Sequence, residues 1–175
     1  MKSVRSFAFA LLALGLAACD QEPLKSKSPG EPAPLTQGVQ AFVQVDNVQA
    51  SPGEQVKVYV RVQMGTENAA KLGSYTGRLR FNPEALKWVA DVQINDGLRV
   101  TNPNGAEQGE LRFAGAAAGG FSTLALYQGT FEVKKPGYMD GLELQMEEIS
   151  AAGSLSSLQP QLQVAPQIFR RVEGR

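Results

Sequence analysis

The sequence predicts an all-β domain, a sandwich of about eight or nine short strands. Apolar and polar residues alternate with a period of two in several short runs, which is typical of strands with one buried face. Clusters of Gly, Pro, Asn and Asp separate these runs, and the chain contains 18 Gly and 10 Pro, enough for many turns. No segment has a helical period of any length, and no internal repeat suggests a solenoid or a propeller.

Residues 1–18 have the pattern of a secretory signal peptide. A basic start precedes an apolar run at 7–16, which is too short to span a bilayer. The motif Leu-Ala-Ala-Cys at 16–19 resembles the bacterial lipobox, so we expect Cys19 to carry the lipid anchor of the mature chain. The alternative is an unmodified thiol after an ordinary cleavage site. The sequence therefore predicts an exported lipoprotein of the bacterial cell envelope, and it leaves open which membrane or leaflet holds the anchor.

The segment 19–38 is rich in Pro, Lys, Ser, Glu and Gln and contains almost nothing apolar. Such a composition buries too little surface to offset the entropy cost of ordering, so we expect a flexible tether there. Residues 39–165 are then expected to form the domain, and residues 166–175 a polar, frayed tail.

The composition excludes several classes of function. Lys plus Arg equals Asp plus Glu at 17 each, so no net field suggests nucleic acid as a partner. The chain has no His, which excludes triads that use histidine and most zinc sites. A single Cys excludes an intrachain disulfide and a thiol metal cluster. We therefore expect neither a metal nor a cofactor.

Within the domain, the first strand is expected at 39–46, and Ser-Pro-Gly-Glu at 51–54 predicts a turn after it. Valines at 56, 58, 60 and 62 then alternate with polar or aromatic residues, which predicts a half-buried strand. The later strand candidates lie, in chain order, at 75–81, 86–90, around 98–100, and at 110–116, 124–133, 142–147 and 162–164.

The segment 73–89 lies at the centre of this plan. Apolar or small residues at 75, 77, 79 and 81 alternate with polar residues at 76, 78 and 80. Asn82-Pro83 then forces a turn, because proline cannot donate to a strand ladder and restricts the residue before it. Trp88, the only tryptophan, is in phase with Leu86, so we expect it in the core.

In their order and spacing, these segments resemble a cohesin domain, the receptor module known from cellulosomes. The matching pieces are Ser-Pro-Gly-Glu-Gln-Val-Lys-Val at 51–58, Leu-Gly-Ser-Tyr at 72–75, Phe-Asn-Pro-Glu-Ala-Leu at 81–86, Gly-Glu-Leu-Arg-Phe-Ala-Gly-Ala at 109–116 and the run 124–134. The likeness spans roughly residues 39–164. It implies a nine-stranded jelly-roll or Greek-key sandwich with no catalytic site and no metal of its own. It also implies a protein partner, since the family binds the calcium-loaded helices of a dockerin module.

The resemblance further implies where a partner binds. It places the strand 75–81 beside 110–116, and that strand beside the short one around 98. If the apolar residues of all three point inward, the arginines between them share one outer face. At positions where cellulosomal cohesins carry Asn and Asp, this chain has Ser and Thr. The predicted partner-binding residues are Ser74, Thr76, Arg78, Arg80, Arg99 and Arg112.

The alternative for these arginines is a purely structural role. They would then be solvated, or paired across neighbouring strands with Glu110 and Glu132, at about 0–1 kcal/mol for each pair. If the arginines do bind, an acidic partner follows, with association that weakens as salt rises.

The sequence predicts no enzyme. Glu143 and Glu147 could suggest a glycosidase pair, but they alternate with apolar residues, which indicates a solvated strand face. Ser122 and Thr123 have no histidine to activate them.

Two alternatives to a protein-binding module remain open. Carbohydrate binding, with a polysaccharide as the partner, would use exposed rings. The candidates are Trp88, Tyr59, Tyr127 and Tyr138, of which only Tyr59 is expected to be exposed. The other alternative is a structural lipoprotein in an envelope or secretion assembly.

Overall fold

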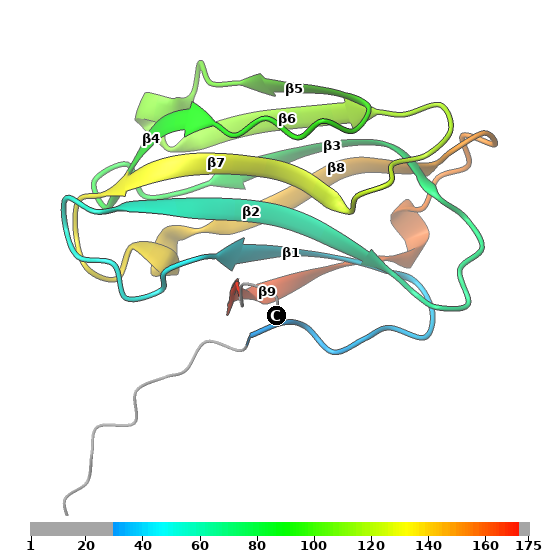
Figure 1. Cartoon of the computed structure of the whole chain (residues 1–175), viewed down its shortest axis with the longest axis horizontal. Coiled ribbons are helices and arrows are strands. Elements are labelled where there is room, and N and C mark those ends of the chain that lie inside the picture. Colours follow the sequence, from blue (N-terminus) through cyan, green and yellow to red (C-terminus); the bar gives the residue numbers. More distant parts are fainter. Residues whose placement is uncertain (1–29, 172–175) are drawn as a thin grey trace, which may run out of the picture.

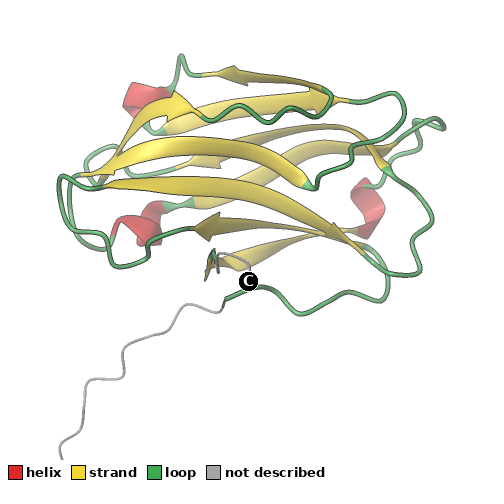
Figure 2. Ribbon diagram, viewed as in Figure 1, coloured by secondary structure: helices red, strands yellow, loops and turns green. Residues whose placement is uncertain are grey.

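The computed structural model describes residues 30–171 and shows two β-sheets packed face to face (Figure 1). Nine strands and three short 3-10 helices make up the regular structure of these residues (Figure 2). The strands are β1 (Val39–Val45), β2 (Gln55–Met64), β3 (Leu72–Arg80), β4 (Leu86–Asp91), β5 (Leu98–Asn102), β6 (Glu110–Ala116), β7 (Ala125–Val133), β8 (Glu143–Ala151) and β9 (Leu162–Arg170). The 3-10 helices are η1 (Ala106–Gln108), η2 (Tyr138–Gly141) and η3 (Gln159–Gln161). The predicted all-β sandwich is confirmed. No helix within residues 30–171 is long and apolar enough to cross a membrane.

The two sheets contain five and four strands. The five-stranded sheet has the order β4-β7-β2-β1-β9, and the four-stranded sheet has the order β5-β6-β3-β8. The strand pairs of the described residues are antiparallel except for β1 with β9, which is parallel. Strands far apart in the sequence, such as β2 and β7 or β3 and β8, are neighbours in these sheets, as in a jelly roll.

The core lies between the inner faces of the two sheets. The four valines of β2 at 56, 58, 60 and 62 are at most 2% exposed, as their alternation predicts. From the other sheet, Leu79 and Leu111 reach the same core with no exposed surface. Period-two burial therefore fixes which side chains of β2, β3 and β6 point outward.

The turn predicted at Asn82-Pro83 ends β3 and leads into β4. The Asn82 side-chain oxygen accepts a hydrogen bond from the Glu84 N–H at 2.9 Å, and the Asn82 carbonyl accepts one from the Leu86 N–H at 2.9 Å. Gly109 lies beside this turn at φ +80°, and a Cβ there would lie 2.1 Å from the Phe81 carbonyl oxygen. Only glycine allows the two backbone segments to come this close, and at this distance the Phe81 N–H donates to Gly109 O at 2.8 Å.

Strand β9 corrects the boundary of the predicted tail, because it continues through 166–170. Its parallel register with β1 shifts between Ala41 and Val43, where partner positions advance from Val164 to Ile168. Pro166 falls in this irregularity, where its missing N–H removes no ladder bond. Phe169 is 1% exposed and packs edge-on against the Phe42 ring at 5.5 Å. The sequence did not reveal residues 166–170 as part of a strand, because an edge strand can be largely polar.

The described part of the tether, residues 30–38, also lies against the domain. Gly65 N–H donates to Gly38 O at 2.8 Å, and Thr66 N–H donates to Leu35 O at 3.1 Å. Gln37 donates from its side chain to the Glu67 carboxylate at 2.8 Å. The tether boundary is therefore earlier than composition predicts. The predicted signal peptide, Cys19 and residues 20–29 lie outside the described residues.

Candidate functional site

The outer face of the four-stranded sheet carries most of the predicted partner-binding residues. Along β3, Ser74, Thr76, Arg78 and Arg80 alternate with buried residues and point away from the core. In the register of β3 with β6, Arg78 stands opposite Arg112, which brings these side chains onto one surface. We call this surface, formed by the outward side chains of β5, β6, β3 and β8, the outer face.

One half of the outer face is a network of ion pairs. Arg78 pairs with Glu147 and lies 3.9 Å from Glu110, while Arg80 lies 3.4 Å from Glu110. Arg112 Nε donates to Glu110 Oε1 at 3.0 Å. This hydrogen bond, with a smaller contribution from Arg80, holds the pKa of the Glu110 carboxyl below its ordinary value.

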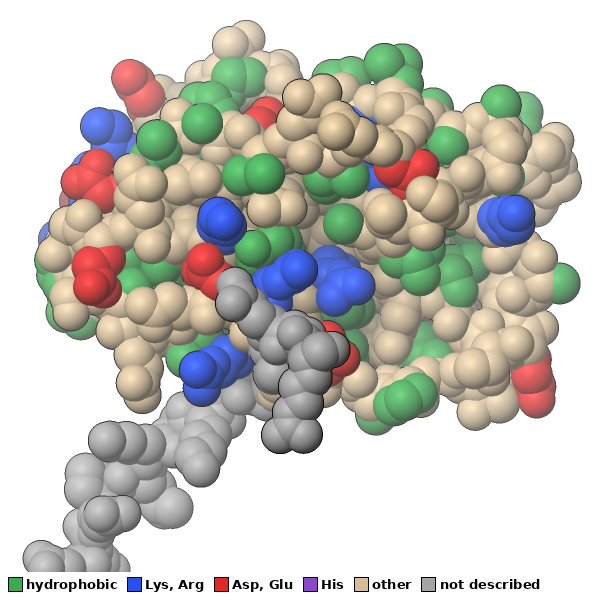
Figure 3. Space-filling model, viewed as in Figure 1, with side chains coloured by type: hydrophobic (Ala, Val, Ile, Leu, Met, Phe, Trp, Pro, Cys, Tyr) green, Lys and Arg blue, Asp and Glu red, His purple; other side chains and the backbone are tan. Residues whose placement is uncertain are grey.

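These pairings bear on the alternative that the arginines have a purely structural role, paired with Glu110 and Glu132. Glu110 does pair with the arginines, whereas Glu132 belongs to β7 in the other sheet. Because carboxylates accompany the guanidinium groups, the outer face carries no block of positive charge that would select an acidic partner. On the side of the molecule shown in Figure 3, basic and acidic side chains are likewise interspersed.

The other half of the outer face is apolar and hollowed. Leu98 and Val100 of β5 are 69% and 54% exposed, and they stand opposite Ala116 and Ala114 of β6. Because alanine is short, the pairing leaves a groove of about 320 Å³. Its polar rim consists of Ser74, Thr76 and Glu148. A second hollow of about 310 Å³, lined by Ala117, Ala152 and Leu155, continues from Ser74 and Ala116.

The prediction that Arg99 lies on the outer face is wrong. Its side chain is 12% exposed and turns inward, where Nη1 donates to the Tyr75 hydroxyl at 2.6 Å and to Ala125 O at 2.5 Å. The guanidinium carbon lies 4.5 Å from the Phe121 ring centroid, and Nη2 lies 3.5 Å from the Asp96 carboxylate. These partners compensate for burying the charge, so β5 presents Leu98 and Val100 outward and Arg99 inward.

The aromatic candidates do not form an exposed platform. Tyr59, expected to be exposed, is 6% exposed, and the Arg171 guanidinium carbon lies 4.3 Å from its ring centroid. Tyr127 and Tyr138 are 3% and 2% exposed. Trp88 is half-buried and packs against the core from β4. The expectation for Tyr59 fails because a residue distant in sequence covers its ring.

The carboxylates singled out for catalysis lie on the outer face. Glu147 is paired with Arg78, and Glu143 lies 4.0 Å from Arg80. Within residues 30–171, no group of three or more His, Cys, Asp or Glu side chains is placed to hold a metal ion.

No protein-family model matches the chain, and no curated protein matches it. Several solved structures do match. A non-cellulosomal cohesin from the archaeon Archaeoglobus fulgidus is 19% identical with a TM-score of 0.56, covering 78% of this chain and 92% of that one. The sixth cohesin of scaffoldin B from Acetivibrio cellulolyticus, solved with a dockerin, is 13% identical with a TM-score of 0.56, covering 78% and 100%. A cohesin module from a Clostridium perfringens family 33 glycoside hydrolase is 15% identical with a TM-score of 0.55, covering 79% and 100%.

The domain has the cohesin fold. The resemblance inferred from the motifs at 51–58, 81–86 and 109–116 is thus confirmed for the fold. Sequence reasoning missed the apolar half of the outer face of this cohesin-like domain, because the placement of the arginines supposed that the apolar residues of this strand point inward, whereas Leu98 and Val100 are exposed. No signal in the sequence could have identified it, because alternation along this strand of five residues does not say which of its two faces is buried.

Proposed function

We propose that the chain is a non-catalytic binding module that receives a protein partner on the outer face of its four-stranded sheet. The observation that carries this proposal is the groove lined by Leu98 and Val100 beside the ion-pair network of Arg78 and Glu110. An apolar centre beside polar and charged groups is the usual anatomy of a protein–protein interface. Exposed large apolar side chains gathered in one groove also mark such sites.

The solved neighbours suggest the kind of partner. Cohesins of Acetivibrio cellulolyticus and Clostridium thermocellum are seen in complex with dockerins. A dockerin-like helical module is therefore the first candidate for this chain. Its apolar side chains would enter the groove, and its polar groups would exchange with the ion pairs at the rim. Anchored through Cys19, the domain would present this surface at the cell envelope.

The proposal is tested by reversing the chemistry of the groove. Leu98→Asp with Val100→Asp places two carboxylates at its centre, next to Glu148. The matched control is Val89→Asp with Val164→Asp, which changes two exposed apolar residues on the five-stranded sheet. Both variants are checked for fold by circular dichroism. They then serve as bait for proteins of the envelope fraction and, as a defined probe, for a calcium-loaded dockerin module.

We expect the groove variant to bind its partner with a Kd about 30-fold or more higher than that of the wild type, as for substitutions at the centre of an interface. The control should bind as the wild-type chain does. If the folded groove variant retains every partner of the wild type, the outer face is not the site. If binding is then lost only in the control, the recognition surface lies on the other sheet. A structural role in an envelope assembly would instead yield partners that both variants retain.

A further inference from the structure

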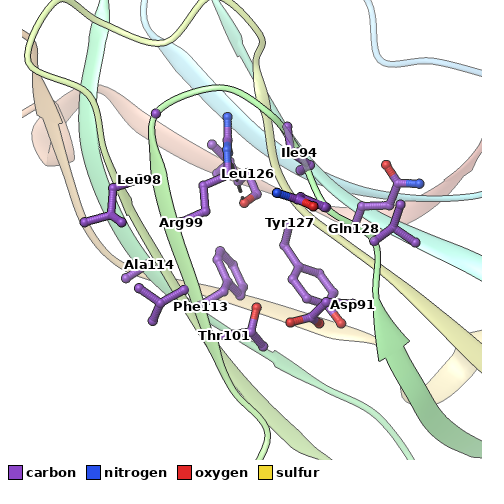
Figure 4. Close-up of a pocket in the computed structure, with 14 residues that line it drawn as sticks. Asp91, Ile94, Leu98, Arg99, Thr101, Phe113, Ala114, Leu126, Tyr127 and Gln128 are labelled. Atoms are coloured by element: carbon purple, nitrogen blue, oxygen red, sulfur yellow. Dashed lines mark hydrogen bonds between the residues drawn. The ribbon is translucent and has the colours of Figure 1, made fainter.

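A cavity of about 430 Å³ opens at the edge of the sandwich, where β4 of one sheet approaches β5 of the other (Figure 4). Its walls come from the end of β4, the connection 92–97, and strands β5, β6 and β7. The volume lies within the range of small-molecule sites in proteins. The outer-face groove is a different hollow, formed on the solvent side of β3, β5 and β6.

The Tyr127 hydroxyl faces this cavity without a well-formed hydrogen bond. Tyr127 is 3% exposed, and among the described residues its hydroxyl makes no well-formed hydrogen bond, although the Asp91 carboxylate and the Trp88 indole lie close to it. Gly129 makes the room for it, because a Cβ at that position would lie 2.1 Å from the phenolic oxygen. A buried hydroxyl that a glycine accommodates and that makes no well-formed hydrogen bond is an unusual feature of a folded domain.

Two further polar groups accompany this hydroxyl. Figure 4 shows the Asp91 carboxylate and the Thr101 side chain at the same end of the cavity as the Tyr127 hydroxyl. Burial, and secondarily the charge of Asp91, raise the Tyr127 pKa far above its ordinary value, so this group stays a neutral donor. The Trp88 indole N–H, three residues before Asp91 on β4, is also buried without a partner in the described chain.

The rest of the wall is apolar, apart from the amide side chains of Gln93 and Gln128 and an arginine that is already engaged. Ile94, Phe113 and Leu126 contribute apolar surface, and the Phe113 ring stacks on the Tyr127 ring at 5.6 Å. Arg99 lines the cavity, but its guanidinium is engaged by Tyr75 and Ala125. The groups left for a ligand are thus one carboxylate, hydroxyl groups, two neutral amides and apolar walls.

This set of groups selects the charge of the ligand. An anion would meet the Asp91 carboxylate and be repelled. A cation would suit Asp91 but would itself accept no hydrogen bond from the Tyr127 hydroxyl or the Trp88 N–H. A neutral molecule with neighbouring hydroxyl groups offers a donor to Asp91 and acceptors to Tyr127 and Trp88, since each hydroxyl donates one hydrogen bond and accepts others. Its C–H faces would lie against the apolar wall.

We propose that this cavity binds a neutral polyhydroxylated molecule of the size of a single sugar ring, held by Asp91 and the Tyr127 hydroxyl. This mode of sugar binding differs from an exposed aromatic platform, because the ligand would lie in a half-open hollow at the edge between the sheets. The polar groups of the cavity are not those of the outer-face groove, although Leu98, Val100 and Ala114 line both hollows.

The test is a titration of the isotope-labelled mature chain with D-glucose, D-galactose and N-acetyl-D-glucosamine at millimolar concentration, followed by nuclear magnetic resonance. Saturable shifts confined to the amides of residues 91–101 and 126–128 are expected with at least one sugar. Tyr127→Phe removes the hydroxyl alone, and Asp91→Asn removes the charge at an exposed position with little change of size. Each should weaken binding about tenfold.

The matched control is Tyr138→Phe, which deletes a hydroxyl that donates to the Asn47 carbonyl outside the cavity. It should leave sugar binding unchanged. The proposal is overturned if none of the three sugars shifts the cavity amides. It is also overturned if Asp91→Asn binds as wild type does, or if methylammonium or acetate binds there instead. None of these results bears on the partner proposal, which is read from protein capture.

Discussion

Replacing Arg99 by alanine removes a guanidinium whose side chain is only 12% exposed. In the folded chain, this group donates to the Tyr75 hydroxyl at 2.6 Å, to Ala125 O at 2.5 Å and to Asp96 O at 2.8 Å. Truncation takes one donor from each of these acceptors and leaves the Asp96 carboxylate, itself 13% exposed, without its cation.

The loss of unfolding free energy depends on which of the groups that contact Arg99 keep another hydrogen-bond partner. Removing one member of a buried charged pair costs about 3–5 kcal/mol of unfolding free energy. The Tyr75 hydroxyl still donates to Leu126 O at 2.6 Å, and Asp96 still accepts from the Thr123 N–H at 2.7 Å. We therefore expect Arg99→Ala to lower the free energy of unfolding by about 3–4 kcal/mol, the lower half of that range.

The matched control is Arg112→Ala. Its side chain is 55% exposed and pairs with Glu110 at 3.0 Å, so its removal should cost about 0–1 kcal/mol. Urea unfolding followed by Trp88 fluorescence and by circular dichroism gives both free energies, provided that the two signals coincide. Equal midpoints and slopes for the two variants would refute the inward placement of Arg99.

Three other changes test separate parts of the molecule. Gly109→Ala should cost more than Gly53→Ala, which itself should cost about 1–3 kcal/mol. Both glycines have positive φ, but only Gly109 would place a Cβ against backbone, so equal melting temperatures would contradict the close approach to Phe81. Because Arg112 lowers the Glu110 pKa in the folded chain, this carboxylate contributes stability that is fully present above the unfolded-state pKa. That contribution is lost as the pH falls through the lowered pKa of the folded chain. Glu110→Gln should therefore flatten the acid limb of the stability–pH curve. Identical acid limbs for the variant and the wild type would exclude this contribution of Glu110. Finally, Cys19→Ser should abolish metabolic labelling with palmitate, and a variant that still takes up label would rule out the predicted anchor.

The sequence by itself determined what depends on neighbours along the chain. Alternation identified β2 and placed Ser74, Thr76, Arg78, Arg80 and Arg112 on a solvent face, because side chains of a strand point to opposite faces in turn. The Asn82-Pro83 turn is also local, since the hydrogen bonds that close it join Asn82 to Glu84, Ala85 and Leu86. Motif order was sufficient to predict the cohesin fold.

Only the tertiary structure decided features that depend on residues far apart in the chain. The face of β5 that is buried depends on Tyr75, Phe121 and Ala125, which compensate the Arg99 charge and turn Leu98 and Val100 outward. Strand β9 exists because β1 offers it a free edge, despite Pro166 and a polar composition. The cavity around Tyr127 combines walls from four strands and a loop. Alternation shows that a strand has two faces, but only the groups packed across from an edge strand determine which face is buried.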